Sequence, residues 1–196
     1  IEEEAESNLS KGFQMLKLKI GLALLGWGTR EDIRLIEAFR RTIGDSSKFM
    51  VDANCAYSIP EAIEIGRACE RFAVYWFEEP VPPHDYDGYA YLSDKLDVPI
   101  AGGEGWAMVS EFNEIFRRRA VSYAQPDVCS AGGITEVQKI SALAQAVNID
   151  CIPHAWGTPI AIASSLHVLA NKPGKTLLEF DQSDNPIRDH LIKEPF

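Results

Sequence analysis

Ionisable side chains recur along the chain at nearly even intervals, each one at the end of a short apolar run. They are Asp52, Glu78, Glu104, Asp127, His154 and Glu179. The intervals of roughly 25 residues match one strand plus one helix of a parallel α/β fold. We therefore expect these side chains to lie at the carboxyl ends of successive strands, where they would converge on one site.

The first three members of this series, Asp52, Glu78 and Glu104, are all carboxylates. Three carboxylates on consecutive strands would repel one another strongly unless a cation lay between them. Oxygen ligands in roughly octahedral order suit Mg²⁺, with Mn²⁺ as the alternative, whereas Zn²⁺ prefers nitrogen and sulfur. Each acid alone could equally be a solvated strand-end residue or half of a structural ion pair. Three carboxylates at the ends of successive strands, at the same level, favour a metal site.

The segment YWFEEP at 75–80 carries an aromatic run directly into two adjacent carboxylates. Successive side chains of a strand point to opposite faces, so only one of Glu78 and Glu79 can face the interior of a barrel. The even spacing favours Glu78 as the metal ligand. Glu79 is left for a supporting hydrogen bond.

Two lysines, Lys17 and Lys19, share one face of the otherwise apolar segment LKLKI. Placing two charges there is costly unless a site uses them, although a surface ion pair with a neighbouring acid is the alternative. Close to Lys17 and a divalent cation, Lys19 is expected to have a lowered pKa and could act as a general base.

His154 follows Asp127 by the same strand-plus-helix interval. A lone histidine is usually structural, but an aspartate on the preceding strand could form a dyad that fixes its tautomer and raises its basicity. Asn54 shares the strand face of Asp52 and is expected to bind substrate beside it.

Short apolar runs alternate with longer amphipathic segments along the whole chain. The expected strands are 15–20, 48–54, 74–79, 99–104, 121–127, 150–154 and 176–181. The expected helices are 2–12, 30–44, 60–73, 85–96, 110–120, 134–147 and 159–171. This alternation predicts a parallel sheet covered by helices. Since no GxGxxG or Walker motif occurs, a (β/α)8-type TIM barrel fits better than an open doubly wound sheet.

A closed eight-stranded barrel commonly needs about 250 residues, and the chain has 196. We expect residues 1–196 to form a barrel domain with strands two to eight. The first strand, and a further domain, would then belong to a longer two-domain protein.

Composition narrows the class of protein. A formal net charge of −10 leaves no basic stripe for nucleic acid. No apolar run approaches the roughly 20 residues that span a bilayer, and the first residues lack the features of a signal peptide. The cysteines lie without zinc-ligand spacing at Cys55, Cys69, Cys129 and Cys151. Reduced thiols, and a soluble cytoplasmic protein, are expected.

A set of short motifs carries a family resemblance. They are KLK at 17–19, VDAN at 51–54, FEEP at 77–80, GGE at 102–104, QPD at 125–127, PHAWGT at 153–158 and LEFD at 178–181. In this order they resemble the enolase superfamily, in particular its mandelate racemase group, over nearly the whole chain from about Gly12 to Asp184. EEP or GGE alone would be a weak signal, whereas the combination is specific.

The resemblance implies a modified (β/α)7β barrel, preceded in the group by an N-terminal capping domain that has no counterpart here. It implies Mg²⁺ held by Asp52, Glu78 and Glu104. Lys17 and Glu179 match residues that contact the substrate carboxylate. The base and acid on either side of the substrate carbon would be Lys19 and the His154–Asp127 pair. The group's barrels are often homo-oligomers.

The reaction implied is abstraction of the proton beside a carboxylate, through an enediolate. Dehydration of a sugar acid to a 2-keto-3-deoxy acid is the preferred outcome, because VDANCAYS, WFEEPVPP and QPDVCSAGGITE are more similar to the dehydratase branch. Racemisation or epimerisation of a 2-hydroxy acid on the same site is the alternative. Two rivals from other classes are a non-catalytic metal-dependent sugar-acid binding protein and a Schiff-base aldolase using Lys19.

Overall fold

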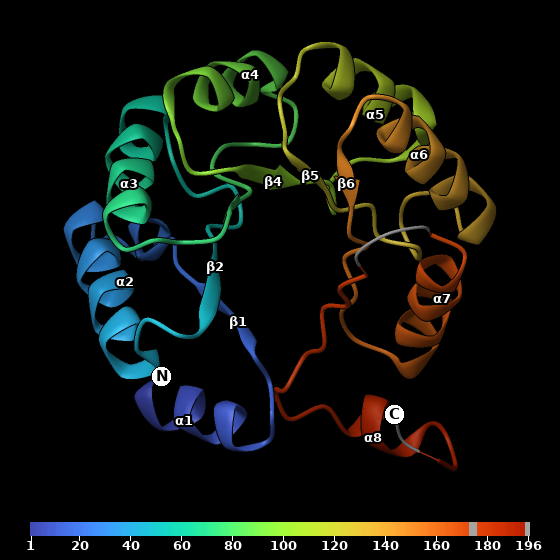
Figure 1. Ribbon diagram of the computed structural model, residues 1–196, viewed down its shortest axis with the longest axis horizontal. Helices are drawn as coiled ribbons and strands as arrows, with labels where there is room; N and C mark the ends of the chain where they lie inside the picture. The colour runs from blue at the N-terminus through green and yellow to red at the C-terminus, as the bar shows by residue number, and fades with distance from the viewer. Residues whose placement is uncertain (173–175, 195–196) are drawn as a thin grey trace. The chain divides into compact units, whose positions relative to one another are not determined.

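The computed structural model describes residues 1–172 and 176–194 of the chain (Figure 1). The chain divides into two compact units. Unit 1 contains Ile1–Ala101 and Arg118–Ser122, and unit 2 contains Gly102–Arg117 and Tyr123–Phe196. The strands follow one another in the sheet in the order of the chain, from β1 to β6. Strand and helix alternate in both units, which is the pattern that the apolar runs predict.

The strands of unit 1 place the expected site residues at one level. These strands are β1 (Met15–Lys19), β2 (Lys48–Asp52), β3 (Phe77–Glu78) and β4 (Ile100–Gly102), whose last residue begins unit 2. They pair in parallel, with Lys19 opposite Asp52 and Asp52 opposite Glu78. Three charged side chains therefore end three neighbouring strands in register.

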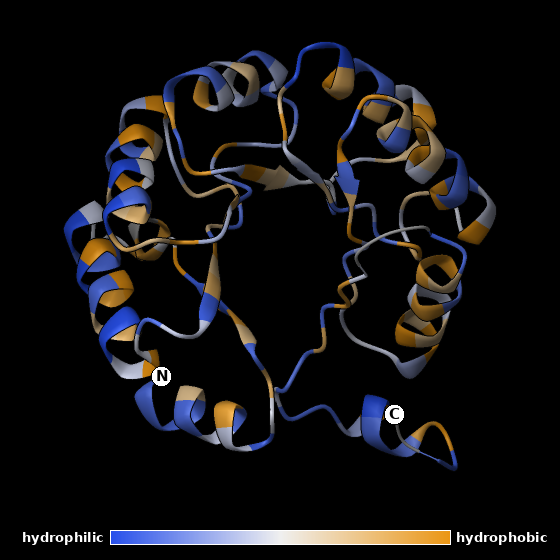
Figure 2. Ribbon diagram, viewed as in Figure 1, coloured by the Kyte–Doolittle hydropathy of each residue, from blue (hydrophilic) through white to orange (hydrophobic). Residues whose placement is uncertain are grey.

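The helices of unit 1 are α1 (Glu2–Ser10), α2 (Thr29–Ile43), α3 (Ile59–Arg71) and α4 (Tyr86–Lys95), with a 3₁₀ turn η1 at Leu22–Leu25. Helix α3 begins with a capping box in which Ser58 and Glu61 satisfy each other's backbone N–H groups. Helix α2 alternates hydrophobic and hydrophilic residues (Figure 2) and buries Ile36 and Phe39. Helix formation here follows from local caps and from a buried apolar face.

Unit 2 repeats this arrangement with shorter strands. Its elements are α5 (Met108–Arg117), β5 (Tyr123–Ala124), α6 (Ile134–Ala146), β6 (Asp150–Cys151), α7 (Pro159–Ala170) and α8 (Pro186–His190). Strands β5 and β6 pair in parallel, and an isolated parallel bridge joins Asp127 to His154 beyond their ends. Helix α7 begins where Thr158 accepts a hydrogen bond from Ala161 N, directly before Pro159. The bridge brings the two residues of the expected dyad onto neighbouring segments.

The structure confirms the parallel α/β class and the seven expected helices, with ends shifted by a few residues. The strands are shorter than expected, since β3, β5 and β6 have two residues each. The seventh expected strand, 176–181, is wrong, because these described residues form no strand and are only half-buried or exposed. An apolar run indicates burial, but a strand also needs a hydrogen-bonded neighbour, which the run does not specify. Among the described residues, no helix has the length and apolar character to cross a membrane.

Candidate active site

Five of the predicted site residues lie together in unit 1, and we call them the lysine–carboxylate cluster: Lys17, Lys19, Asp52, Asn54 and Glu78. Lys17 Nζ lies 2.6 Å from Glu78 Oε1 and 3.5 Å from Asp52 Oδ2. Lys19 Nζ donates to the carboxylate of Asp52 and, at 2.9 Å, to Asn54 Oδ1. Strand register explains the grouping, because Lys19, Asp52 and Glu78 end neighbouring strands.

The carboxylates of this cluster are buried, whereas one of its lysines is not. Asp52 and Glu78 are 0% and 1% exposed, the Lys17 side chain is 12% exposed and that of Lys19 is 56% exposed. Burial raises the pKa of Asp52, but the charges of Lys17 and Lys19 and the hydrogen bonds from Lys19 and the Asn54 N–H outweigh it, so the pKa is lowered. Asp52 is therefore an anion at neutral pH, and Lys19 is the cation that solvent and a ligand can reach.

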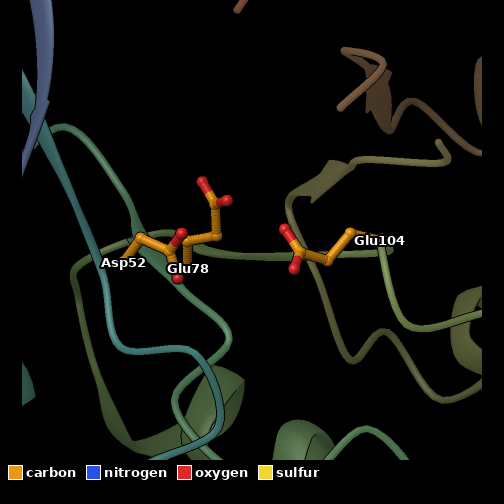
Figure 3. A group of neighbouring side chains, drawn as sticks. All are labelled: Asp52, Glu78 and Glu104. Carbon is orange, nitrogen blue, oxygen red and sulfur yellow. The ribbon is translucent and has the colours of Figure 1, made fainter. Parts of the chain in front are cut away.

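Asp52 and Glu78 form the unit 1 part of the predicted metal site (Figure 3). A carboxylate oxygen of one lies within 4.8 Å of a carboxylate oxygen of the other. Two buried hard oxygen donors at this separation fit the ligand preferences of Mg²⁺. Trp76, which the sequence argument did not assign to the site, donates its indole N–H to Glu78 Oε2 at 2.9 Å. Its position two residues before Glu78 on an extended segment is the signal that could have identified it.

Glu79 has a different partner from Glu78. It is buried and its Oε2 lies 3.5 Å from Cys55 Sγ. Its φ is +42°, and Asn54 and Cys55 also have φ in the left-handed region, at +43° and +63°. Non-glycine residues adopt this conformation at a cost and often do so beside functional sites. These residues with positive φ follow Asp52 and Glu78 closely in the chain. After Asp52, the backbone N–H of Asn54 donates a hydrogen bond to Asp52 Oδ1 at 2.9 Å.

A buried aspartate that the sequence argument missed fixes the loops beside the cluster. Asp32 Oδ1 accepts from the N–H groups of Gly21 and Leu22, each at 3.0 Å, and Oδ2 accepts from Tyr57 Oη at 2.8 Å. Gly21 has φ of +99°, and a Cβ there would lie 2.8 Å from the carbonyl oxygen of Ala53. Asp32 thus ties the loop after β1 to the loop after β2. Only its place in the first turn of an expected helix was visible in the sequence.

The remaining predicted residues lie together in unit 2, and we call them the histidine–carboxylate cluster: Glu104, Asp127, His154 and Glu179. His154 Nδ1 lies 2.6 Å from Asp127 Oδ2. His154 Nε2 lies 3.1 Å from Glu104 Oε2 and 3.9 Å from Glu179 Oε2. The imidazole therefore has a carboxylate partner at each ring nitrogen, Asp127 at Nδ1 and Glu104 at Nε2.

Asp127 is held in place on both sides. Cys129 N donates to its Oδ1 at 2.6 Å, while Oδ2 faces His154. Burial raises the pKa of Asp127, but the hydrogen bond from His154, the N–H of Cys129 and the histidine charge outweigh it and lower the pKa. An anionic Asp127 is therefore available to orient the imidazole and to stabilise its charged form.

Glu104, the third expected metal ligand, belongs to unit 2 and follows β4 (Figure 3). The preceding residue, Gly103, has φ of +150°, and a Cβ there would lie 2.6 Å from the carbonyl carbon of Gln125. Only glycine allows so close an approach of the two segments. The Glu104 carboxylate is partly buried and faces His154. The structure thus gathers the predicted site residues into two clusters, one in each unit.

The fold and the two clusters define a parallel α/β domain of the TIM-barrel class whose strand ends carry acid–base groups. The chain belongs to the enolase superfamily, since the family model described as "Enolase C-terminal domain-like" matches residues 1–196. The resemblance inferred from the motifs is confirmed.

Known relatives show a range of reactions. The chain is 37% identical over 200 residues to the D-galactarolactone cycloisomerase of Agrobacterium fabrum, covering 98% of this chain and 52% of the relative. It is 37% identical over 196 residues to the arabinonate dehydratase of Saccharolobus solfataricus, covering 99% and 51%. Other relatives include an epimerase. The chain spans about half the length of the curated relatives it matches.

Solved structures agree with this relationship. The 3,6-anhydro-D-galactonate cycloisomerase of Zobellia galactanivorans has a TM-score of 0.91 and 44% identity, covering 97% of this chain and 52% of that chain. The L-talarate dehydratase of Polaromonas sp. JS666, in complex with Mg and L-glucarate, has a TM-score of 0.82 and 31% identity, covering 92% and 48%. The relatives are thus enzymes, and one of them was crystallised with magnesium and a sugar acid.

Proposed function

We propose that this protein abstracts the proton beside the carboxylate of a sugar acid and then eliminates the oxygen on the neighbouring carbon, in a Mg²⁺-dependent reaction. The observation that carries the proposal is the pairing of a proton-transfer group with carboxylates in each cluster. Lys19 adjoins Asp52 in unit 1. His154 adjoins Asp127 and Glu104 in unit 2.

The proposed metal ligands are Asp52, Glu78 and Glu104. They supply hard oxygen donors of the kind that Mg²⁺ prefers, and two of them are buried carboxylates with nearby oxygens. When bound, the cation would act as a Lewis acid for the second negative charge that develops on the substrate carboxylate. The bound cation would also attract a carboxylate substrate, which these acidic side chains alone would repel.

Lys17, Asn54 and Glu179 are proposed to bind and orient the substrate. Lys17 and Asn54 already make polar contacts within the lysine–carboxylate cluster, so little reorganisation is needed to hold a ligand. Glu179 lies 3.9 Å from His154 Nε2 and could accept a hydroxyl hydrogen of a sugar acid. An ordered set of donors and acceptors lowers the entropic cost of reaching the reactive geometry.

Lys19 and His154 are proposed as the two proton-transfer groups. Lys19 Nζ, once it has lost its proton, would take the proton from the substrate carbon; with the opposite stereochemistry His154 Nε2 would take that proton and the Lys19 ammonium would give one to the departing oxygen. In the first case His154, oriented through Nδ1 by Asp127, would use Nε2 to protonate the departing oxygen. General acid–base groups of this kind each contribute about 10²–10⁴-fold to the rate.

The leaving oxygen decides between two outcomes of the same elimination. A free hydroxyl departs as water, and the sugar acid becomes a 2-keto-3-deoxy acid, as we propose first. An oxygen that closes a ring stays attached to the substrate, and the product is an isomer. This second candidate is favoured by the similarity to two cycloisomerases. Return of the proton to carbon, as in an epimerase, is the remaining alternative.

The test is proton NMR in D₂O with Mg²⁺ and the full-length protein, against aldonic acids, aldaric acids and their anhydro or lactone forms. Formation of a keto-deoxy acid from an open-chain acid would support dehydration, and conversion of only the cyclic forms would support cycloisomerisation. Exchange of the α-proton with all hydroxyls retained would favour epimerisation. If Mg²⁺ bound but neither turnover nor exchange occurred across the panel, the proposal would be wrong and a non-catalytic binding role would replace it.

A further inference from the structure

A buried hydrogen bond links Trp76 to Glu78. The indole Nε1 donates to Glu78 Oε2 at 2.9 Å, and the two residues are 2% and 1% exposed. Trp76 immediately precedes β3, and its carbonyl accepts from Val51 N at 3.1 Å, so it continues the pairing with β2. Two residues apart on an extended segment, the indole and the carboxylate lie on the same face.

The two oxygens of Glu78 receive donors of different character. Oε1 faces Lys17 Nζ at 2.6 Å, and Oε2 faces the indole of Trp76. A lysine ammonium carries three donors on a flexible stem, so it can move when a second cation approaches. An indole carries one donor and no acceptor, and burial fixes the ring. The Trp76 contact is therefore the one that defines the rotation of the carboxylate.

A carboxylate can accept hydrogen bonds and bind a cation at the same time, because each oxygen has about two lone-pair sites. The orientation of a metal-binding carboxylate is commonly fixed by a hydrogen-bond donor behind it, and loss of such a donor weakens metal binding by about 10–100-fold. The geometry of Trp76 and Glu78 matches this role.

We propose that Trp76 is a positioning residue that orients the Glu78 carboxylate for a divalent cation. This inference rests on the proposed function, in which Glu78 is a metal ligand. It assigns Trp76 an effect on cation affinity through its N–H group, separate from the contribution of the ring to the core.

The experiment measures Mn²⁺ affinity of the full-length protein by calorimetric titration at a temperature where every variant is folded. Trp76→Phe removes the N–H and part of the ring. Replacement of Trp76 by benzothienylalanine, an isostere with sulfur in place of the N–H, removes the donor and keeps the shape. Both should bind Mn²⁺ about 10–100-fold more weakly than the unaltered protein. Phe112→Leu is the control for lost core packing, because Phe112 is a fully buried aromatic residue of helix α5 that packs against Phe116.

If Trp76 had only a structural role, Trp76→Phe would have a lower melting temperature, as in the control. The benzothienylalanine variant would then bind Mn²⁺ as tightly as the unaltered protein, and this unchanged affinity would overturn the inference. Glu78→Gln separates this failure from that of the proposed function. If Glu78→Gln weakens Mn²⁺ binding and the Trp76 variants do not, only the role of Trp76 is wrong. If Glu78→Gln also binds Mn²⁺ normally, the proposed ligand set is wrong and the role of Trp76 is lost with it.

Discussion

At the scale of single residues, the site consists of charges that neutralise each other at short range. The buried carboxylates Asp52 and Glu78 each contact a lysine, and His154 contacts the carboxylates of unit 2. A buried charge without a partner is strongly destabilising, so these contacts allow the acids to remain ionised inside the protein. The same contacts help to lower the pKa values of Asp52 and Asp127.

Glu78→Gln tests the metal assignment at this scale. The amide keeps the shape of the side chain but removes the negative charge that would hold the cation, so Mg²⁺-dependent turnover should fall by roughly 10³-fold or more. Activity assays with Mg²⁺ and circular dichroism would measure the loss and the fold. Glu79→Gln is the matched control, since its carboxylate faces Cys55, and it should stay within roughly tenfold of the unaltered protein. Equal losses in both variants would contradict the assignment.

The lowered pKa of Asp127 predicts a contribution to stability that depends on pH. Unfolded aspartate has a pKa of about 3.9, and the folded value is lower, so the folded state favours the ionised form. The contribution is complete above about pH 5 and is lost as the pH falls through the folded pKa. Urea unfolding should be measured at several pH values below about 5. As the pH falls, the free energy of unfolding should decrease less in Asp127→Asn than in the unaltered protein.

The control for this series is Asp184→Asn, which removes an exposed carboxylate. It should follow the unaltered protein at every pH. If the free energy of unfolding fell more steeply with acid in Asp127→Asn than in the unaltered protein, the pKa of Asp127 in the folded state would not be lowered.

At the scale of elements, the strand register and the loops after the strands position the site. The pairing of β1 with β2 and of β2 with β3 brings Lys19, Asp52 and Glu78 to one level. The loops after β1 and β2 meet at Asp32, whose carboxylate has three buried or partly buried donors. Burial, together with the hydrogen bond to Asp32, raises the pKa of Tyr57, so its hydroxyl remains a donor. The Asp32 side chain therefore contributes to the stability of both loops.

Asp32→Ala should destabilise the protein by about 3–5 kcal/mol, because it leaves the N–H groups of Gly21 and Leu22 and the hydroxyl of Tyr57 without their acceptor. Asp32→Asn should cost less, since its amide oxygen can still accept from the two N–H groups. Urea denaturation would measure both. The neighbouring Glu31→Gln is the control, as Glu31 contacts only Arg34 in the described contacts, and should change stability by less than about 0.5 kcal/mol. A similar loss for Asp32→Ala and Glu31→Gln would refute the role of Asp32.

The elements differ in how far the sequence predicted them. The helices could be located because amphipathic spacing and caps such as Ser58 and Thr158 are local signals. The segment 176–181 was misread as a strand, because its apolar run says nothing about hydrogen-bonded partners. The grouping of the candidate residues into clusters could be predicted from their spacing, which follows the repeat of strand and helix. Trp76 could have been identified from its place two residues before Glu78, whereas the role of Asp32 depends on contacts between loops that the repeat does not describe.

At the scale of the whole molecule, the family model and the motif resemblance agree on the enolase superfamily, and the relatives compared above are enzymes. The chain carries a formal net charge of −10, so cations gain from long-range attraction as well as from their ligands. The expected exclusion of nucleic acid, the homo-oligomeric state and the cytoplasmic location stay predictions. The expected placement of the chain as strands two to eight of a larger two-domain protein is also a prediction.

Cation binding should raise the stability of the whole protein. A ligand that binds only the folded state at about 100 times its Kd adds about 2.7 kcal/mol, which corresponds to a rise in melting temperature of roughly 5–10 °C for a domain of this size. Thermal unfolding with and without Mg²⁺, after treatment with a chelator, would measure the rise. Glu78→Gln should show little or none of it, and an equal rise in that variant would indicate that Mg²⁺ binds elsewhere.

The Asp32 contact also separates a fixed part of one loop from a variable part. The backbone N–H groups of Gly21 and Leu22 donate hydrogen bonds to Asp32. Leu24, Leu25 and Trp27, further along the same loop, are exposed. Sequence changes at 24–28 should thus leave the backbone next to Lys19 in place. For directed evolution this makes the distal half of the loop a suitable region for randomised libraries, in which new sequences can be sampled at little risk to the backbone beside Lys19.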